Sequence, residues 1–160
     1  MKNYITAVVL SALLFTSCAN EFNRVYKAND YSYKYEYAKE CYAQGKYTRA
    51  STLLQGLVTL QKGTDNAQES LYMLGMAEYN SKDYEGAAAT FKKYFSSYPK
   101  GAYAQEAEFY AGMSLYNSTP EPRLDQSQTV NAIAAFQEYI DLFPSFHTPF
   151  LRHRLPLNRR

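Results

Sequence analysis

Apolar residues between positions 30 and 144 recur at helical spacing. Tyr35, Ala38 and Tyr42 fall at i, i+3 and i+7, which predicts one face of a helix, and Asp30 is placed to cap its start. Tyrosine also alternates with polar residues in "DYSYKYEYAKE", so a strand is the alternative. We favour the helix because of the spacing of the three apolar residues and the capping position of Asp30.

The same pattern then repeats along the chain. Ala38, Gly75 and Gly112 are separated by 37 residues, whereas Phe91 and Phe136 are separated by 45. The difference of eight residues indicates an insertion in the third unit, at "NSTPEPRLDQSQT", which is rich in Pro, Ser and Thr. Three units at nearly constant spacing predict an all-α solenoid of helix pairs over residues 30–144.

The second unit, "LYMLGMAEYNSKDYEGAAATFKKYFSSYP", resembles a tetratricopeptide repeat. Leu74, Gly75, Ala87, Phe91 and Pro99 fall at the spacing of that family. Gly75 and Ala87 let the paired helices approach closely, Phe91 fills the space between units, and Pro99 cannot prolong the second helix. The signature positions of the third unit are Gly112, Phe136 and Pro144. The resemblance implies a right-handed superhelix of about three such repeats.

In the tetratricopeptide family, the first helix of each unit lines the concave side of the superhelix. This register predicts a partner groove of six aromatic residues and two methionines: Tyr35, Tyr42, Tyr72, Met76, Tyr79, Phe109, Met113 and Tyr116. Lys39 falls in the same register. Such side chains make an apolar, adaptable surface that suits an extended or helical peptide. The alternative is that they only pack the helix pairs.

The first 17 residues have the features of an export signal. Lys2 precedes an apolar run from Tyr4 to Phe15 that is too short to span a membrane. Small residues then lead to Cys18, an arrangement that resembles a bacterial lipoprotein signal, in which cleavage occurs before a cysteine that becomes acylated. We therefore expect lipidation of Cys18 and a linker over residues 18–29. An ordinary secretory signal that contains a cysteine is the alternative.

Composition and motifs narrow the classes of function. Residues 18–144 carry 15 acidic and 12 basic side chains and no basic stripe, which argues against nucleic acid as a partner. No sequence motif for a metal site, a catalytic nucleophile or a phosphate-binding loop is present, so we expect neither an enzyme nor a bound cofactor. Cys41 has no histidine nearby in sequence, and we expect it to be a small buried residue.

With the export signal and the repeats together, the chain resembles the BamD-type outer-membrane assembly lipoproteins. The resemblance covers residues 18–144 and rests on "YEYAKECYAQGKYTRA", "YPKGAYAQEAEFYAGMSLY" and "PEPRLDQSQTVNAIAAFQEYIDLFP". It implies a lipid anchor in the outer membrane and a periplasmic location. It also implies two kinds of partner, the β-barrel insertase and unfolded outer-membrane proteins.

The inserted loop contributes to this resemblance through Arg123, Asp125 and Gln126. We expect Arg123 and Asp125 to pair with each other, because they are two residues apart and of opposite charge, and so to order the loop. An unstructured insertion is the alternative.

The last sixteen residues, "SFHTPFLRHRLPLNRR", differ in character from the rest. They contain four Arg but no Lys, Tyr or acid, whereas residues 1–144 contain 10 Lys and 3 Arg. This change suggests a shifted reading frame, which resequencing to a continuous frame would refute, and a basic tail that contacts anionic lipid is the alternative. Members of the BamD-type family carry about five repeats, whereas this sequence shows about three. We therefore expect this form to be marginally stable and impaired in contact with the insertase, with apolar surface exposed on the helix that ends near Phe143.

Two other classes of protein share some of these features. A generic tetratricopeptide lipoprotein that scaffolds cell-wall or envelope complexes has the same repeats, although ordinary scaffolds lack the "RLDQ" loop. A glycan-binding lipoprotein of the outer membrane also has helical repeats and aromatic surfaces. Such proteins are far longer and usually use tryptophan, which is absent from the sequence.

Overall fold

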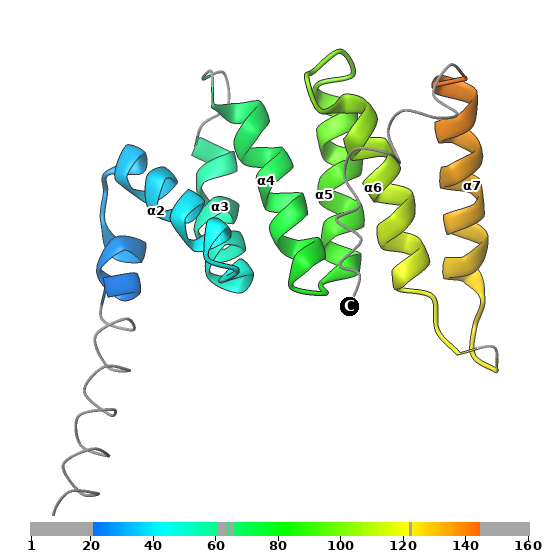
Figure 1. The fold of residues 1–160 in the computed structure, drawn as a ribbon, viewed down its shortest axis with the longest axis horizontal. Helices are drawn as coiled ribbons and strands as arrows, with labels where there is room; N and C mark the ends of the chain where they lie inside the picture. Colours follow the sequence, from blue (N-terminus) through cyan, green and yellow to red (C-terminus); the bar gives the residue numbers. More distant parts are fainter. Residues whose placement is uncertain (1–20, 61–63, 65, 122, 145–160) are drawn as a thin grey trace, which may run out of the picture. The chain divides into compact units, whose positions relative to one another are not determined.

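The computed structural model describes residues 21–60, 64, 66–121 and 123–144, and these form helices joined by turns and loops (Figure 1). The helices are α2 (Tyr31–Ala43), α3 (Tyr47–Leu60), α4 (Ala67–Asn80), α5 (Tyr84–Ser97), α6 (Ala104–Asn117) and α7 (Ser127–Leu142). No strand occurs in the described ranges, so the all-α prediction is confirmed. The predicted export signal, Cys18 and the tail over 145–160 lie outside the described residues.

The chain divides into two compact units, of which the first ends at Asp83 and the second begins at Tyr84. In the first unit, α3 packs against both α2 and α4. In the second unit, α6 packs against both α5 and α7 (Figure 1). Such packing between consecutive helices is expected for tetratricopeptide-like repeats.

The core of the first unit follows from the apolar spacing of α3. Ala50, Leu53, Leu54 and Leu57 fall at i, i+3, i+4 and i+7, and each is at most 2% exposed. They pack with Tyr35, Ala38 and Cys41 of α2 and with Leu74 and Ala77 of α4. Cys41 is therefore the small buried residue that the sequence predicted, and burial raises the pKa of its thiol.

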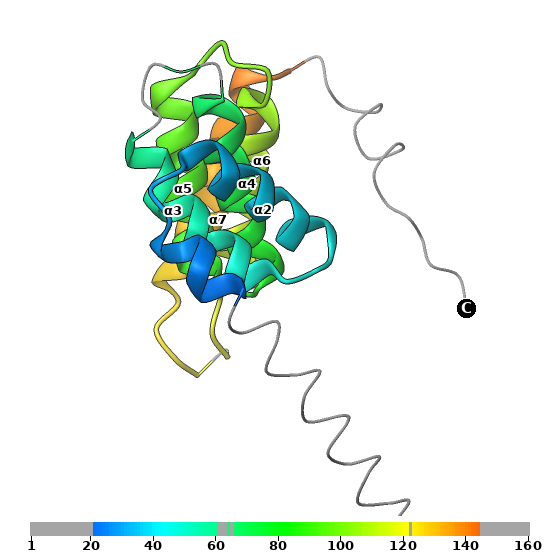
Figure 2. The ribbon, with the colours of Figure 1, turned by 90° about the vertical axis from the view of Figure 1, so that its left-hand side faces the viewer.

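Asp30 caps α2 as predicted, because its Oδ1 accepts a hydrogen bond from the N–H of Tyr33 at 3.0 Å. The preceding stretch differs from the linker predicted over residues 18–29. Residues 21–27 are helical and lie against the first unit (Figure 2). Val25 is fully buried in the core of that unit, which a linker residue would not be.

Two turns that are 37 residues apart have the same backbone geometry. Gly45 follows α2 with φ of 73°, and Lys82 follows α4 with φ of 68°. In each turn, the N–H of the next residue donates to the carbonyl five residues earlier, which is the Schellman arrangement. These bonds run from Lys46 to Cys41 at 2.8 Å and from Asp83 to Glu78 at 2.9 Å.

The turn after α6 departs from this geometry. The Thr119 N–H donates to the Tyr116 carbonyl at 3.1 Å, as the equivalent residues do in the other two turns. The next residue is Pro120, which has no N–H and so cannot make the second bond. The chain continues instead through the inserted loop, residues 118–126, before α7 begins.

The second unit has its largest buried side chains on α5. Phe91 and Tyr94 are fully buried, and the Phe91 ring stacks on Tyr110 of α6 with centroids 5.6 Å apart. The Tyr94 hydroxyl accepts a hydrogen bond from the Tyr103 N–H at 3.2 Å. One core side chain therefore holds the short turn between α5 and α6.

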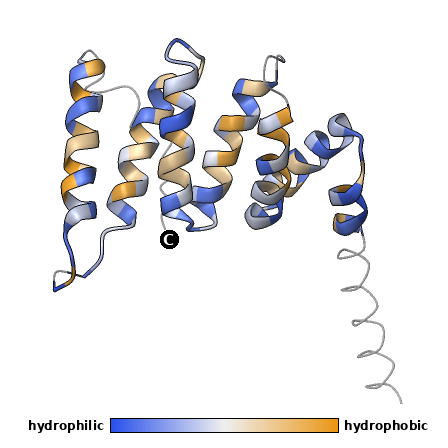
Figure 3. Ribbon diagram, turned by 180° about the vertical axis from the view of Figure 1, so that it is seen from behind, coloured by the Kyte–Doolittle hydropathy of each residue, from blue (hydrophilic) through white to orange (hydrophobic). Residues whose placement is uncertain are grey.

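The outer face of α7 is apolar and exposed. Val130, Ile133, Ile140 and Leu142 are between 46% and 65% exposed, and hydrophobic stretches are visible along α7 in Figure 3. Exposure of apolar surface on this helix was predicted from the sequence and is confirmed.

Candidate partner-binding surface

The predicted groove residues of the first unit differ in how much of their surface is buried. Tyr35 is 4% and Tyr72 is 8% exposed, so both are mainly core residues. Burial raises the pKa of the Tyr35 hydroxyl, with nearby Glu69 adding to the effect. The Lys39 ammonium lies 4.8 Å from the centre of the Tyr35 ring and 2.7 Å from a carboxylate oxygen of Glu36. The ammonium therefore lies between the Tyr35 ring and the Glu36 carboxylate.

The other three groove residues of this unit are half-buried: Tyr42, Met76 and Tyr79. The Tyr42 ring meets Tyr47 edge-on, with centroids 5.4 Å apart. Its hydroxyl accepts a hydrogen bond from the Asn80 side-chain amide at 3.3 Å, which joins the end of α2 to the end of α4. These side chains have one side in the packing and part of their surface accessible to a partner.

In the second unit, the predicted groove residues lie on α6. Phe109 contacts Phe136 and Tyr139 of α7, with ring centroids 6.2 Å and 5.7 Å apart. Met113 is half-buried, whereas Tyr116 is 59% exposed. Phe109 therefore mainly packs the helix pair, and Tyr116 is the groove residue that offers most surface to a partner.

The structure therefore gives these residues two kinds of surroundings. Tyr35, Tyr72 and Phe109 follow the packing alternative, because they are buried or bound to neighbouring rings. The half-buried tyrosines and methionines and the exposed Tyr116 have the accessibility that a binding surface needs. Binding of a peptide by this set stays a prediction.

The repeat signature residues include one close helix contact. A Cβ atom added to Gly112 of α6 would lie 2.9 Å from a ring atom of Phe136 on α7, closer than real Cβ contacts. The glycine therefore allows the ring of Phe136 to lie against the backbone of α6. Of the other signature residues, Leu74, Gly75, Ala87 and Phe91 are buried, and Pro99 and Pro144 are exposed after α5 and α7.

The inserted loop is ordered by different contacts from those expected. No ion pair joins Arg123 to Asp125 in the described part of the loop. The Asp125 carboxylate instead accepts hydrogen bonds from the Ser127 N–H at 3.1 Å and from the Ser127 hydroxyl at 2.8 Å, and these bonds lower its pKa. A carboxylate two residues before a helix start reaches the first backbone N–H more easily than a neighbouring exposed cation.

Gln126 makes the longest-reaching contacts of this loop. Its side-chain amide donates to the carbonyls of Glu121 and Leu124, each at 3.0 Å, and its oxygen accepts from the Thr129 hydroxyl at 2.8 Å. One side chain thus connects the middle of the loop to the first turn of α7. The sequence pointed to Gln126, but not to these partners.

Two features of the second unit escaped the sequence interpretation. The bond between Tyr94 and Tyr103 joins residues nine apart, and no spacing rule predicts it. Glu108 on α6 is only 4% exposed, and burial raises the pKa of its carboxyl, with Glu138 adding to the effect and Lys92 opposing it. A raised pKa favours folding at low pH, and this contribution is lost as the pH rises through the raised value.

The part of the chain that the structure describes has no group of three or more His, Cys, Asp or Glu side chains that could hold a metal ion. Within the same residues, no helix combines the length and the apolar character needed to cross a bilayer.

Comparison with known proteins adds to this geometry. Residues 27–154 match the sequence model of the YfiO family, described as outer membrane lipoprotein. A protein of Aquifex aeolicus, named as an outer membrane protein assembly factor, BamD, is 30% identical over 132 residues, which cover 80% of this chain and 42% of that protein. Outer membrane protein assembly factor BamD of Caulobacter vibrioides is 22% identical over 142 residues, which cover 87% of this chain and 47% of the relative.

The chain thus spans a little under half the length of these two relatives. The family match, however, covers most of the sequence and includes all six helices from α2 to α7. On this ground the chain belongs to the YfiO family of outer membrane lipoproteins.

Proposed function

We propose that the chain is a lipid-anchored protein on the periplasmic face of the outer membrane, where it takes part in the assembly of outer membrane proteins. The observation that carries the proposal is the family match over residues 27–154. The names of both relatives, which are assembly factors, support it. The anchor is the predicted acyl group on Cys18.

Its partners in this proposal are the periplasmic part of the β-barrel insertase and the unfolded barrel proteins themselves. The first unit offers the half-buried side chains of Tyr42, Met76 and Tyr79, and the second unit offers the half-buried Met113 and the exposed Tyr116. These are rigid rings and adaptable thioethers. Unfolded barrel strands alternate apolar and polar side chains, so they offer apolar groups to such a surface. Contacts of this kind give modest affinity, which a hand-over step requires.

Photocross-linking from the surface itself tests this proposal. The full chain would carry a photoreactive phenylalanine in place of Tyr116, which is 59% exposed and can be replaced without disturbing the core. The matched control carries the same group at Ile133 on α7, which is 65% exposed and outside the predicted groove. Both variants would be irradiated in cells that assemble outer-membrane proteins, and the products identified by mass spectrometry.

We expect the Tyr116 variant to cross-link to the barrel insertase or to unfolded barrel proteins, and the Ile133 variant to do so much less. Cross-links only to cell-wall or division proteins would overturn the assembly role and favour the scaffold alternative. Equal yields from the two positions would contradict the groove while leaving the assembly role supported.

A further inference from the structure

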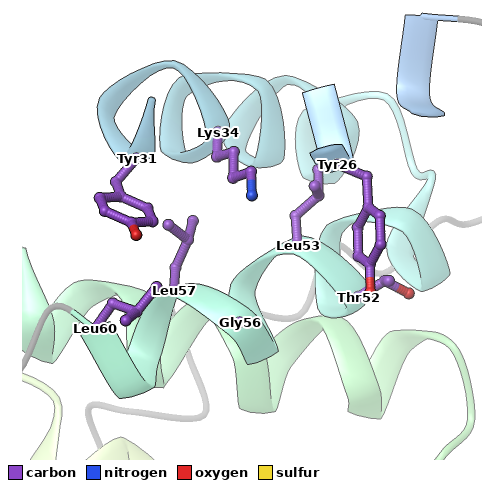
Figure 4. Close-up of a pocket in the computed structure, with 8 residues that line it drawn as sticks. All are labelled: Tyr26, Tyr31, Lys34, Thr52, Leu53, Gly56, Leu57 and Leu60. Carbon is purple, nitrogen blue, oxygen red and sulfur yellow. The ribbon is translucent and has the colours of Figure 1, made fainter. Parts of the chain in front are cut away.

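An apolar pocket opens on the first unit beside the helical segment 21–27. Its cavity is about 60 Å³, and the pocket is lined by Tyr26, Tyr31, Lys34, Thr52, Leu53, Gly56, Leu57 and Leu60 (Figure 4). We call this set the tyrosine pocket. In Figure 4, Tyr31 and Tyr26 flank Lys34 from opposite sides, and Leu57 and Leu60 face them from α3.

The mouth of the tyrosine pocket exposes large apolar groups. Tyr26 is 52%, Tyr31 is 47% and Leu60 is 56% exposed. A Cβ atom added to Gly56 would meet nothing within 4 Å, so the floor of the pocket is open at that point. None of these residues belongs to the predicted partner groove.

Lys34 gives the mouth a positive charge. Its ammonium lies 6.0 Å from the centre of the Tyr26 ring, a cation–π contact, and no acidic side chain among the described residues forms an ion pair with it. Glu36, the nearest acid in sequence, pairs with Lys39 at 2.7 Å, and Asp30 uses its carboxylate to cap α2 through the Tyr33 N–H. The mouth therefore suits a ligand that joins an apolar part to an anionic group.

The distance to the anchor favours one source for that ligand. Three peptide units separate Cys18 from Glu21, which allows a reach of at most about 11 Å. Five helical residues then lead to Tyr26, or about 8 Å at 1.5 Å each. Since the lipid headgroup layer is itself about 5–8 Å deep on each side, an acylated Cys18 keeps Tyr26 close to the membrane surface.

The helical segment 21–27 is packed into the first unit, so the position of the anchor also limits how far the rest of this unit can lie from the membrane. Val25 is fully buried among the core residues of α2 and α3, and the Arg49 guanidinium lies 5.5 Å from the centre of the Phe22 ring. Because the segment is packed in this way, it does not act as a flexible spacer between the anchor and α2. The first unit is consequently held near the bilayer.

We propose that the mouth of the tyrosine pocket docks on the phospholipid headgroups of the membrane that holds the anchor. Tyr26, Tyr31 and Leu60 lie at the headgroup level, where amphipathic rings are favoured, and Lys34 faces the lipid phosphates. The inference rests on the proposed acylation of Cys18. It adds a second attachment that fixes how the first unit is turned relative to the membrane.

Fluorescence quenching in vesicles tests this surface on the full lipidated chain. A Leu60→Cys variant carries an environment-sensitive fluorophore, and the control is Glu40→Cys, an exposed position about 9 Å further along α2 than Lys34. Cys41 is 2% exposed with a raised thiol pKa, so the introduced cysteine reacts first. The vesicles contain phosphatidylethanolamine, phosphatidylglycerol and a lipid with a nitroxide on its headgroup.

We expect several-fold stronger quenching of the label at position 60 than of the label at position 40. Equal quenching, or none at position 60 in protein that floats with the vesicles, would overturn the docking surface while leaving the anchor intact. Failure to float, with no acyl mass on the mature protein, would overturn the anchor and this inference together. A response at position 60 to a peptide ending in a free phenylalanine carboxylate, without lipid quenching, would assign the pocket to peptide instead.

Discussion

The paired turns at Gly45 and Lys82 allow a reciprocal test of how the repeat is held. A non-glycine residue in the left-handed conformation costs about 1–2 kcal/mol, and replacing glycine by alanine returns about 0.4–1 kcal/mol through the unfolded chain. The site at Gly45 is sterically open, so only the backbone term acts there. We therefore expect Gly45→Ala to lower the free energy of unfolding by about 0.5–1 kcal/mol.

The opposite substitution at the equivalent position should have the opposite sign. Lys82 is exposed and has φ of 68°, so Lys82→Gly removes the conformational cost and should raise the free energy of unfolding by about 0.5–1 kcal/mol. Gln44→Gly is the matched control, because Gln44 has φ of −84° and glycine there only adds chain entropy. The free energies would be measured by urea denaturation followed by circular dichroism.

The signs of these changes in the free energy of unfolding test whether the two turns are equivalent. If Lys82→Gly destabilised the protein as much as Gln44→Gly, the left-handed residue would carry no cost at this turn. If Gly45→Ala had no effect, the two turns would not be equivalent, and the shared geometry would not explain the repeat spacing.

Three further predictions concern the second unit. Gly112→Ala should destabilise the protein by about 1–2 kcal/mol, since overpacking against Phe136 costs about 1–3 kcal/mol and the higher helix propensity of alanine returns about 1 kcal/mol. In a double-mutant cycle, Phe136→Leu should relieve most of this loss, and additive effects of the two substitutions would contradict the contact. Tyr94→Phe removes the acceptor of the Tyr103 N–H and should cost about 1 kcal/mol in thermal unfolding, whereas an unchanged midpoint would show that the bond contributes nothing. Because the pKa of Glu108 is raised, the stability of the natural chain should fall as the pH rises above about 4.5, and Glu108→Gln should flatten this slope; identical pH profiles would refute the assignment.

The helical architecture was predictable because its cause is local. The spacing of Ala50, Leu53, Leu54 and Leu57 is visible in the sequence, and it sets the buried face of α3. Gly45 and Lys82 are separated by the same 37-residue period, and the structure shows that their turns have the same backbone geometry. Periodicity of this kind needs no knowledge of long-range contacts.

The parts that sequence reasoning missed depend on contacts between distant or irregular segments. The sequence predicts a linker over residues 18–29, yet residues 21–27 are helical and Val25 is buried in the core of the first unit. Asp125 was paired with Arg123 by charge alone, but the closer Ser127 N–H takes its carboxylate. In the predicted groove, the burial of Tyr35 and the exposure of Tyr116 could not be read from the register, because both depend on neighbouring helices.

The proline that follows Thr119 has a consequence for the order of folding. Helices α2 and α3 are joined by three residues, whereas nine residues join α6 to α7, and this longer loop costs about 1 kcal/mol more to close. No Schellman bond fixes the turn after α6. The loop therefore samples more conformations before α7 can contact α6. We expect α7 to be the last described helix to dock on its unit and the first to leave it. Its backbone amides should then exchange with solvent faster than those of α6, and the face of α7 that packs against α6 should be the last surface of the described second unit to be covered.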